Sequence, residues 1–401
     1  MSISSKPNKI ISVSVAWLKT FWKSTDSIDV SVSGPSPKIP LRISDFPTPT
    51  RVGYDIKDRQ TPFVEMNFKK LKKYYYEYIN SRAFLNYIPY SDFKLLKLKD
   101  KGFDSGFDVS NFTVLVHKDE FKLPISLSKH RESAIELFKA LGKIRINPVT
   151  KEYQNDLSAR IVDFSTIDGR IVIEPANYFE QVGSNLTIDW ASGLVGGHYD
   201  TFRSIIEKPE LGCLRPLPTS NLANTLGVAV FFKTSDEKIL IPIRGNQQAI
   251  MSEGRGKFHC SASGVFEWPL SIKGKKTVDF EIFLDGMRLE IKRELNINSD
   301  QYELIPLAFA RELARGGKPQ LFFCALSNLD KDSILNEMKN AEENWEFLSE
   351  DQLPKNSPLL KWLTAPESVE QTLEEIESCY TYEGWTGLML TQAFFEGKSI
   401  I

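Results

Sequence analysis

The pattern of apolar and polar residues along the chain changes character near residue 222. Beyond this point, LGVAVFFKTSDEKILIPIR (226–244) predicts two strands joined by a polar turn. The first of them, GVAVFF, is continuously apolar, which is typical of a central strand that is buried on both faces. Further along, residues 304–327 predict two more strands around a loop at Gly316 and Gly317.

Between these two pairs of strands, DGMRLEIKRELNI (285–297) predicts an amphipathic helix. Its apolar residues recur at helical spacing and form one stripe, made of Leu284, Met287, Ile291 and Leu295. Glu290 and Glu294 are four residues apart, so they are neighbours at the shoulder of this stripe. The spacing alone is more typical of solvent-exposed carboxylates than of a metal site. The neighbouring sequence therefore has to decide between the two interpretations.

Residues 1–222 predict a region of the α+β class. A stretch rich in Ser and Pro, residues 31–62, is typical of an extended connector. The remaining predicted elements are a helix over 63–85, a strand over 110–121, a helix over 128–144 that begins at Ser128, and a hairpin over 159–176 that turns at Asp168-Gly169. At the other end of the chain, the tail from Asp330 has a mostly helical pattern.

Composition limits the class of protein. The chain has 401 residues, 41% of them hydrophobic and 25% charged, with a formal net charge of −2, which is ordinary for a globular protein and long enough for two domains. The near-neutral net charge does not indicate a basic surface that would bind nucleic acid. No apolar run approaches the length of a membrane span. The four cysteines form no CxxC pair, which disfavours a zinc site. We therefore expect a cytoplasmic protein that binds neither nucleic acid nor a membrane.

The order of parts from residue 223 to about residue 365 resembles the core of a Nudix hydrolase. The family signature is G-x5-E-x7-R-E-U-x-E-E-x-G-U, where U is an aliphatic residue. Laid on this sequence, it places glutamates at Glu281, Glu290 and Glu294 and an aliphatic residue at Ile297. NWEFLSEDQLP (344–354) resembles the segment before the last helix of that fold. The resemblance implies an α/β/α sandwich with a mixed sheet for residues 223–401, preceded by the α+β region of residues 1–222.

The sequence departs from this signature in several places. Leu289 stands at the arginine, Arg293 at the first glutamate of the E-E pair and Asn296 at the glycine. Asn is a mild replacement where the backbone is left-handed. The opening glycine is assigned to Gly264 in KFHCSASG, so that SASG is expected to form a turn and PLSIKGKKTVD (269–279) an inserted loop.

The resemblance implies a chemistry as well as a fold. Nudix enzymes cleave the diphosphate bond of a nucleoside diphosphate linked to another group, using Mg²⁺ or Mn²⁺ and a water nucleophile. Mg²⁺ takes hard oxygen ligands and keeps several waters, so a few carboxylates are sufficient. The resemblance assigns Glu290 and Glu294 as catalytic metal ligands and the backbone carbonyl of Gly264 as a further ligand. Glu281 would orient this cluster or bind a second ion.

Basic residues would hold the phosphates of the substrate. The candidates are Arg244 at the end of a predicted strand, and Arg255 and Lys257 beside SASG. Arg293 follows Glu290 by three residues, so it can pair with this carboxylate and repel a divalent ion. Two outcomes are open. Either one Mg²⁺ still binds and Arg293 helps to hold a phosphate, or catalysis is lost and the pocket only binds a nucleotide.

Other polar stretches favour structural interpretations. His259 and Cys260 are adjacent on a predicted strand and point to opposite faces, which argues against a nucleophilic dyad. GLVGGHYD (193–200) lacks the spacing of a phosphate loop. RGGKPQ reads as a hairpin turn, and a phosphate contact from Arg315 and Lys318 is the less favoured interpretation. An extra metal carboxylate from outside the helix has three candidates, Glu342, Glu343 and Glu346.

Taken together, these patterns predict a Mg²⁺-dependent diphosphate hydrolase that acts on a nucleotide derivative. A second hypothesis is a catalytically silent Nudix-like module that binds a nucleotide as a sensor or regulator. A third is a structural interaction protein built on the same fold. We expect residues 1–222 to pack on the Nudix-like core, where they shape substrate choice or form a homodimer interface.

Overall fold

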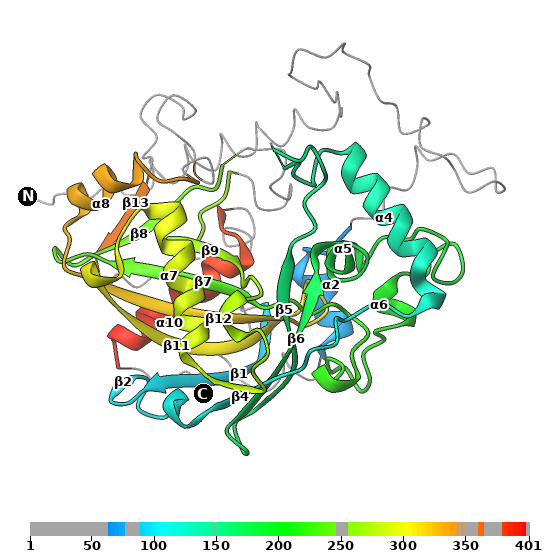
Figure 1. The fold of residues 1–401 in the computed structure, drawn as a ribbon, viewed down its shortest axis with the longest axis horizontal. Helices are drawn as coiled ribbons and strands as arrows, with labels where there is room; N and C mark the ends of the chain where they lie inside the picture. Colours follow the sequence, from blue (N-terminus) through cyan, green and yellow to red (C-terminus); the bar gives the residue numbers. More distant parts are fainter. Residues whose placement is uncertain are drawn as a thin grey trace, which may run out of the picture.

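Two mixed β-sheets organise the chain (Figure 1). The computed structural model describes residues 63–76, 89–147, 149–245, 256–343, 347, 360–364 and 379–397. Within these ranges the large sheet has nine strands in the order β13-β8-β7-β12-β11-β1-β2, with β3 beside β1 and β9 beside β7. The small sheet has four described strands in the order β10-β4-β6-β5. The protein is therefore of the α+β class with mixed sheets, as the sequence predicts at this coarse level.

The strands of the large sheet are β1 (Tyr90–Leu98), β2 (Lys101–Gly102), β3 (Phe107–Asp108), β7 (Gly227–Lys233), β8 (Lys238–Pro242), β9 (Ala262–Val265), β11 (Tyr302–Glu312), β12 (Lys318–Ser327) and β13 (Leu360–Thr364). Those of the small sheet are β4 (Thr113–Val116), β5 (Leu157–Ser165), β6 (Arg170–Asn177) and β10 (Thr277–Asp279). The α-helices are α2 (Phe68–Tyr74), α4 (Ser128–Ala140), α5 (Tyr178–Val182), α6 (Phe202–Ile205), α7 (Glu281–Leu295), α8 (Lys331–Met338) and α10 (Tyr382–Phe395). Short 3-10 helices are η4 (Val109–Asn111), η5 (Ile125–Leu127), η6 (Asn185–Thr187), η7 (Leu217–Thr219), η9 (Leu270–Ile272) and η10 (Ser299–Gln301).

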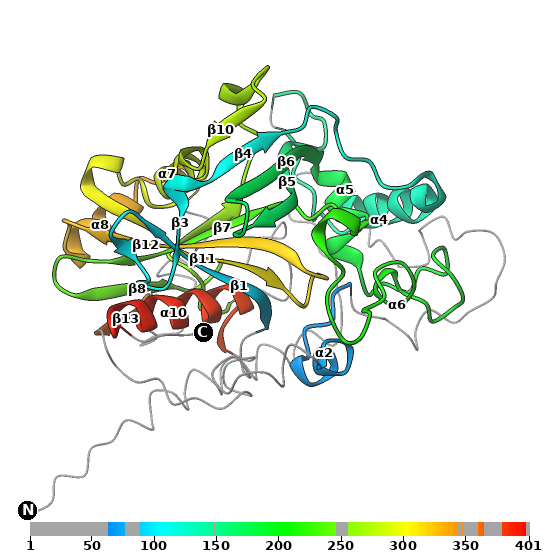
Figure 2. The same ribbon diagram turned by 90° about the horizontal axis from the view of Figure 1, so that it is seen from below.

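Strand β7 lies in the middle of the large sheet and is buried on both faces. It pairs in parallel with β12 and antiparallel with β8 and β9. Its side chains alternate between the two faces, so Val228 and Phe232 pack in the same core as α7, whereas Ala229 and Phe231 pack in the same core as α10. Figure 2 shows α7 and α10 on opposite sides of this sheet. The prediction of a continuously apolar central strand is confirmed.

Several elements agree with the sequence prediction. Helix α4 begins at Ser128, and β5 and β6 form an antiparallel hairpin whose turn has Gly169 at a φ of 56°. Strands β11 and β12 form the other predicted hairpin, and both glycines of its turn have a positive φ. Asn296 ends α7 with a φ of 60°, so this residue adopts the left-handed backbone that was predicted for it.

Other elements differ from the prediction. SASG does not form a turn, because Ala262–Val265 is strand β9, paired along β7. The expected loop over 269–279 ends in β10, which pairs antiparallel with β4. Within 63–76, the predicted helix is limited to α2, and the rest of 63–85 lies outside the described residues. The same holds for residues 1–62 and for all of 344–354 except Phe347.

The parts of the chain before and after residue 222 share both sheets. Strand β1, from the first part, pairs antiparallel with β11, from the second. In the small sheet, β10 from the second part pairs with β4 from the first. One apolar core contains side chains from both parts, for example Ile161 and Phe283. The predicted division at residue 222 therefore does not separate two independently built sheets.

Among the helices that the structure describes, none combines the length and the apolar character that are needed to cross a bilayer.

Candidate functional site

Helix α7 presents its two shoulder carboxylates to strand β9. The apolar stripe of α7 is buried in the core that it shares with the large sheet, and this contact turns Glu290 and Glu294 inward. Glu290 is 7% exposed and Glu294 is 2% exposed. The carboxylate of Glu294 accepts a 2.9 Å hydrogen bond from the backbone N–H of Ser263. Neither carboxylate of the pair points into bulk solvent.

Gly264 lies directly against Glu290. A Cβ atom at this position would be 2.6 Å from Cδ of Glu290 and 2.7 Å from its Oε2. A side chain here would overlap with the carboxylate, so the close approach of β9 to α7 depends on glycine. The sequence assignment paired Gly264 with Glu290 from the signature alone, and the structure brings these two residues together.

A cleft of about 370 Å³ opens beside Glu290 and Gly264. It is lined by residues from both parts of the chain, and many of its side chains are charged. The acidic residues that line it are Asp156, Glu267, Glu290, Glu312, Glu343 and Glu383. The basic residues that line it are Lys143, Arg145, Arg244, Arg293, Arg315 and Lys318. The acidic and basic side chains that line the cleft are equal in number, so they give it no excess of positive charge, and any binding of an anionic group depends on individual cations.

Arg293 turns towards Glu267 at the edge of this cleft. Its two terminal nitrogens donate hydrogen bonds of 2.7 and 3.2 Å to the two carboxylate oxygens of Glu267. Its distance to Oε1 of Glu290 is longer, 3.5 Å. The hydrogen bonds to Glu267 also raise the pKa of Arg293 above its ordinary value. Glu267 therefore holds the guanidinium group to one side of Glu290.

Arg244 is oriented by His259, a buried residue of the segment that leads into β9. Nη1 of Arg244 lies 2.9 Å from Nε2 of His259, and Nδ1 of the same ring lies 2.6 Å from Oγ1 of Thr381. A guanidinium group can only donate, so Nε2 accepts and the proton sits on Nδ1. Burial, and next the charge of Arg244, hold the pKa of His259 well below its usual range. A neutral ring with both nitrogens engaged acts as an orienting group.

A buried charged cluster forms the inner end of the cleft, at the β11–β12 turn. Arg315 pairs with Glu312 at 2.8 Å, and Glu383 at the start of α10 accepts a 2.6 Å hydrogen bond from Gln320. Lys318 is 6% exposed. Burial lowers the pKa of Lys318 to about 8, with Glu383 acting in the opposite direction. Its amine is thus close to its titration point at neutral pH.

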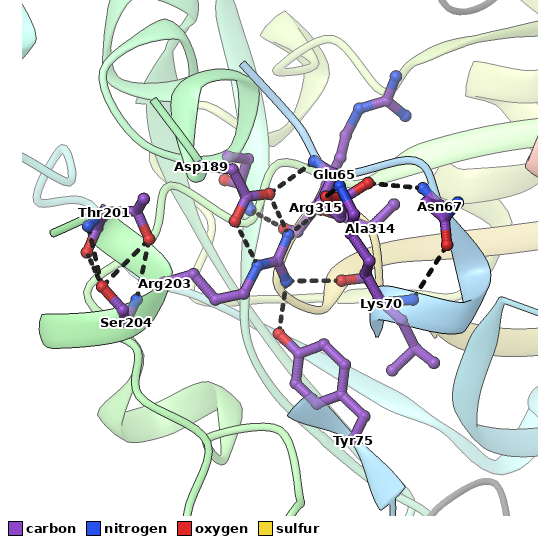
Figure 3. A network of polar contacts seen from close by, with 12 residues as sticks. Glu65, Asn67, Lys70, Tyr75, Asp189, Thr201, Arg203, Ser204, Ala314 and Arg315 are labelled. Carbon is purple, nitrogen blue, oxygen red and sulfur yellow. Dashed lines mark hydrogen bonds and ion pairs between the residues drawn. The ribbon is translucent and has the colours of Figure 1, made fainter. Parts of the chain in front are cut away.

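The β11–β12 turn is fixed in place by Arg203 of α6. This buried guanidinium donates hydrogen bonds of 2.7 and 2.6 Å to the carboxylate of Asp189 and one of 2.6 Å to the hydroxyl of Tyr75. It also donates to the backbone carbonyls of Leu313 and Ala314. Figure 3 shows Arg203 between Asp189, Tyr75 and Ala314. Residues of the first part of the chain therefore set the position of the turn that carries the inner cations.

Among the predicted site residues that the structure describes, Glu281, Glu294 and Lys257 do not line the cleft. Glu281 is the first residue of α7, nine residues before Glu290, which is roughly 14 Å along a helix. Its side chain is 54% exposed and pairs with Arg288 at 2.6 Å, so the predicted metal role of Glu281 has no geometric basis. Lys257 is buried but is not one of the residues that line the cleft. Arg255 lies outside the described residues.

The three candidates for an additional metal-binding carboxylate differ in their position relative to the cleft. Glu343 lines the cleft and pairs with Arg145 at 3.3 Å, Glu342 is exposed, and Glu346 lies outside the described residues. In the described part of the chain, no group of three or more His, Cys, Asp or Glu side chains is arranged to hold a metal ion. A metal site here would consist of fewer protein carboxylates together with backbone oxygen, water and ligand oxygen.

Comparisons with known proteins add little to this geometry. No protein-family model matches the sequence, and no curated protein matches it. Among solved structures, the chain is similar to the crystal structure of DR0079 from Deinococcus radiodurans, with 16% sequence identity over 42% of this chain and 83% of that chain. The TM-score is 0.25, which is too low to indicate a common fold.

Sequence reasoning missed the residues that enter the cleft from the first part of the chain. Lys143 and Arg145 follow α4, whereas Tyr178 and Gln181 belong to α5. Nothing in the local pattern of these segments indicates a site, because only tertiary packing brings them opposite α7. Arg315 and Lys318, which flank a glycine turn, were predicted as a phosphate contact only in the less favoured interpretation, and both line the cleft.

Proposed function

We propose that this protein is a Nudix-type hydrolase that cleaves the diphosphate bond of a nucleoside diphosphate derivative with the help of Mg²⁺ or Mn²⁺. The observation that carries the proposal is the contact between Gly264 and Glu290 at the edge of a cleft lined by cations. The large mixed sheet between α7 and α10 supports a Nudix-type α/β/α sandwich as the fold behind this site.

The residues present fit a magnesium ion. Mg²⁺ is commonly bound by one or two carboxylates, substrate phosphates and water. Glu290, which lines the cleft, and Glu294, one turn further along α7, are the carboxylates that would hold it. Gly264 lies so close to Glu290 that a Cβ atom there would collide with it, and its backbone carbonyl is the further ligand that the resemblance implies. When bound, the ion would neutralise phosphate charge and make a water molecule more acidic.

The chain itself binds and orients the substrate. Arg244, held by His259, and Arg293, held by Glu267, are two guanidinium groups at the same cleft as Glu290. A guanidinium group binds phosphate oxygens through two parallel hydrogen bonds. Because each arginine is already fixed by a neighbour, less side-chain entropy is lost when the phosphates bind. The diphosphate would thus be aligned beside α7.

The second candidate, a silent nucleotide-binding protein, is favoured by a specific observation. Arg293 stands where the family signature has a glutamate, and its nitrogen is 3.5 Å from Oε1 of Glu290. One oxygen of Glu294 is also engaged by the backbone of Ser263. In this case the cleft would bind the same ligand without cleaving it.

One set of measurements separates the candidates. Hydrolysis of a panel of nucleoside diphosphate derivatives with Mg²⁺ would be measured for the wild type, Glu290→Gln and Arg293→Glu, together with Asp285→Asn, an exposed carboxylate change on the same helix, as control. The hydrolase proposal expects activity in the wild type and in Asp285→Asn, loss in Glu290→Gln, and thermal stabilisation by Mg²⁺. Nucleotide binding without hydrolysis or Mg²⁺ stabilisation supports the silent module. Absence of both binding and hydrolysis overturns the two candidates.

A further inference from the structure

The side chain of Ser263, in strand β9, is hydrogen-bonded to the imidazole ring of His259. Oγ of Ser263 lies 2.7 Å from Nε2 of the ring, and Nδ1 of the same ring lies 2.6 Å from Oγ1 of Thr381. Because Nδ1 carries the proton, Nε2 is the acceptor and the hydroxyl group of Ser263 donates to it. A hydroxyl group that is bonded to a base, which a third side chain orients, is the arrangement that activates a nucleophile.

The three side chains line the cleft but differ in exposure. His259 is 2% exposed and Thr381 is 9% exposed, whereas Ser263 is half-buried. The backbone N–H of Ser263 is held at 2.9 Å by the carboxylate of Glu294, which fixes this part of β9 against α7. The base is therefore enclosed, and the nucleophile is the member of the group that presents most surface to the cleft.

Two charged side chains lie against Nε2 of His259. Nη1 of Arg244 is 2.9 Å from this nitrogen, and Oε2 of Glu383 is 3.8 Å from it. In the free protein, Arg244 and Ser263 share the single lone pair of Nε2. A ligand oxygen that attracts the guanidinium group leaves this lone pair to Ser263 and keeps a cation beside the reacting carbonyl, where negative charge develops. The carboxyl group of Glu383 is within ion-pair distance of the imidazolium that forms.

The electrostatics of the ring agree with this sequence of contacts. Burial, and next the charge of Arg244, hold the pKa of His259 well below its usual range. Nε2 is therefore unprotonated at neutral pH and can accept a proton. Because Arg244 is one cause of the low pKa, the ring becomes a stronger base when this guanidinium group turns towards a bound ligand.

We propose that Ser263 is the nucleophile and His259 the general base of a second activity, the hydrolysis of a carboxylic ester whose carbonyl oxygen contacts Arg244. Oγ of Ser263 forms a bond to the carbonyl carbon, and its proton passes to Nε2. The bond between this carbon and the alcohol oxygen then breaks, and the imidazolium protonates the leaving alcohol. Water attacks the acyl-serine in the same way, which releases the carboxylic acid and restores the hydroxyl group. No metal ion takes part, so this activity goes beyond the proposed function.

The test combines covalent labelling with an ester assay on the full-length protein, both in the presence of EDTA. A fluorophosphonate reacts with activated serines, and its phosphoryl oxygen can contact Arg244 as a carbonyl oxygen does. We expect one label per wild-type molecule, located on Ser263 by peptide mass spectrometry. We also expect hydrolysis of p-nitrophenyl butyrate that falls about a hundredfold or more in Ser263→Ala and in His259→Gln. Ser158→Ala, which changes another serine of the same cleft, is the matched control and should retain both label and activity.

The outcome for the wild type does not depend on whether a variant folds. If the folded wild type takes up no label, or takes it up at a residue other than Ser263, the proposal is overturned. Ester hydrolysis that persists undiminished in Ser263→Ala also overturns it, and a rate unchanged in His259→Gln rejects the role of the histidine. Because EDTA removes divalent ions, these results are independent of Mg²⁺-dependent diphosphate hydrolysis, which is measured separately.

Discussion

The carboxylate of Glu290 occupies the space in which a side chain at position 264 would have to sit. A Cβ atom at Gly264 would be 2.6 Å from Cδ of Glu290, closer than non-bonded carbon atoms approach in proteins. This single contact links the strand β9 to the helix α7, and it makes the stability of the protein and the geometry of the cleft depend on the same pair of residues.

Gly264→Ala is expected to destabilise the protein by about 1–3 kcal/mol, the usual range for an overpacked site. Under the proposed function it should also reduce hydrolysis, because Glu290 is displaced. Urea denaturation and the hydrolysis assay measure the two effects. The double variant Gly264→Ala/Glu290→Ala provides the control, because the shorter side chain leaves room for the methyl group. If the two substitutions destabilise additively, the steric relationship between them is disproved.

Arg203→Met is expected to lower the free energy of unfolding by about 3–5 kcal/mol, because it leaves the buried carboxylate of Asp189 without its cation and releases the carbonyls of the β11–β12 turn. Arg288→Met is the matched control. Its ion pairs with Glu281 and Asp285 are at the surface, and we expect a change of at most about 1 kcal/mol. Equal effects of the two substitutions in chemical denaturation would contradict this role of Arg203.

Stability is expected to fall as the pH decreases below neutrality, in part because of His130. Burial lowers the pKa of His130 from 6.5 to about 4. As the pH falls, the unfolded chain takes up this proton near 6.5, whereas the folded chain does so only near 4. The stabilisation from His130 is therefore complete above pH 6.5 and is lost progressively between pH 6.5 and 4.

Between pH 7 and pH 5 this loss amounts to about 2 kcal/mol for one histidine. Denaturation curves at the two pH values, for the wild type and for His130→Gln, measure it by difference, because carboxylates contribute equally to both proteins. The variant should show a smaller decrease than the wild type. A decrease of the same size in both proteins would show that His130 is not the group responsible.

Binding of a nucleoside diphosphate is expected to weaken as the pH rises through about 8, the pKa of Lys318, which lines the cleft. Only the protonated amine carries the positive charge that attracts the phosphates, so affinity is constant at low pH and falls by up to about tenfold per pH unit above 8. The charged groups that act on this amine are Glu383 of α10 and Glu312 and Arg315 of the hairpin. Titrations from pH 6.5 to 9 would show this decline in the wild type, and a flat profile in Lys318→Met.

The sequence predicts the elements of this fold better than their arrangement. The periodic stripe of α7 and the continuous apolar run of β7 are local properties, and both elements are found where expected. Gly264 and Glu290 could be paired because they belong to one known signature. The partner of β11, in contrast, is β1, more than two hundred residues earlier in the chain, and no local pattern specifies such a pairing.

Prediction of the candidate site is limited in the same way, because local motifs identify some of its residues but do not show their tertiary arrangement. Glu290, Arg244 and Arg293 were identified from motifs and do line the cleft. Glu281 satisfies the spacing of the signature, yet α7 begins with this residue and carries it to the opposite end of the helix from the cleft. Gln181 escaped notice because only tertiary packing brings α5 to the cleft.

The exchange of strands between the two parts of the chain has a consequence for how this protein is made. A shortened product that started after residue 222 would leave the edge of β11 uncovered, and a bare strand edge is a template for association with other chains. Neither sheet can be completed before both portions have been synthesised, and a chain that lacked either portion would have a strand edge without its partner.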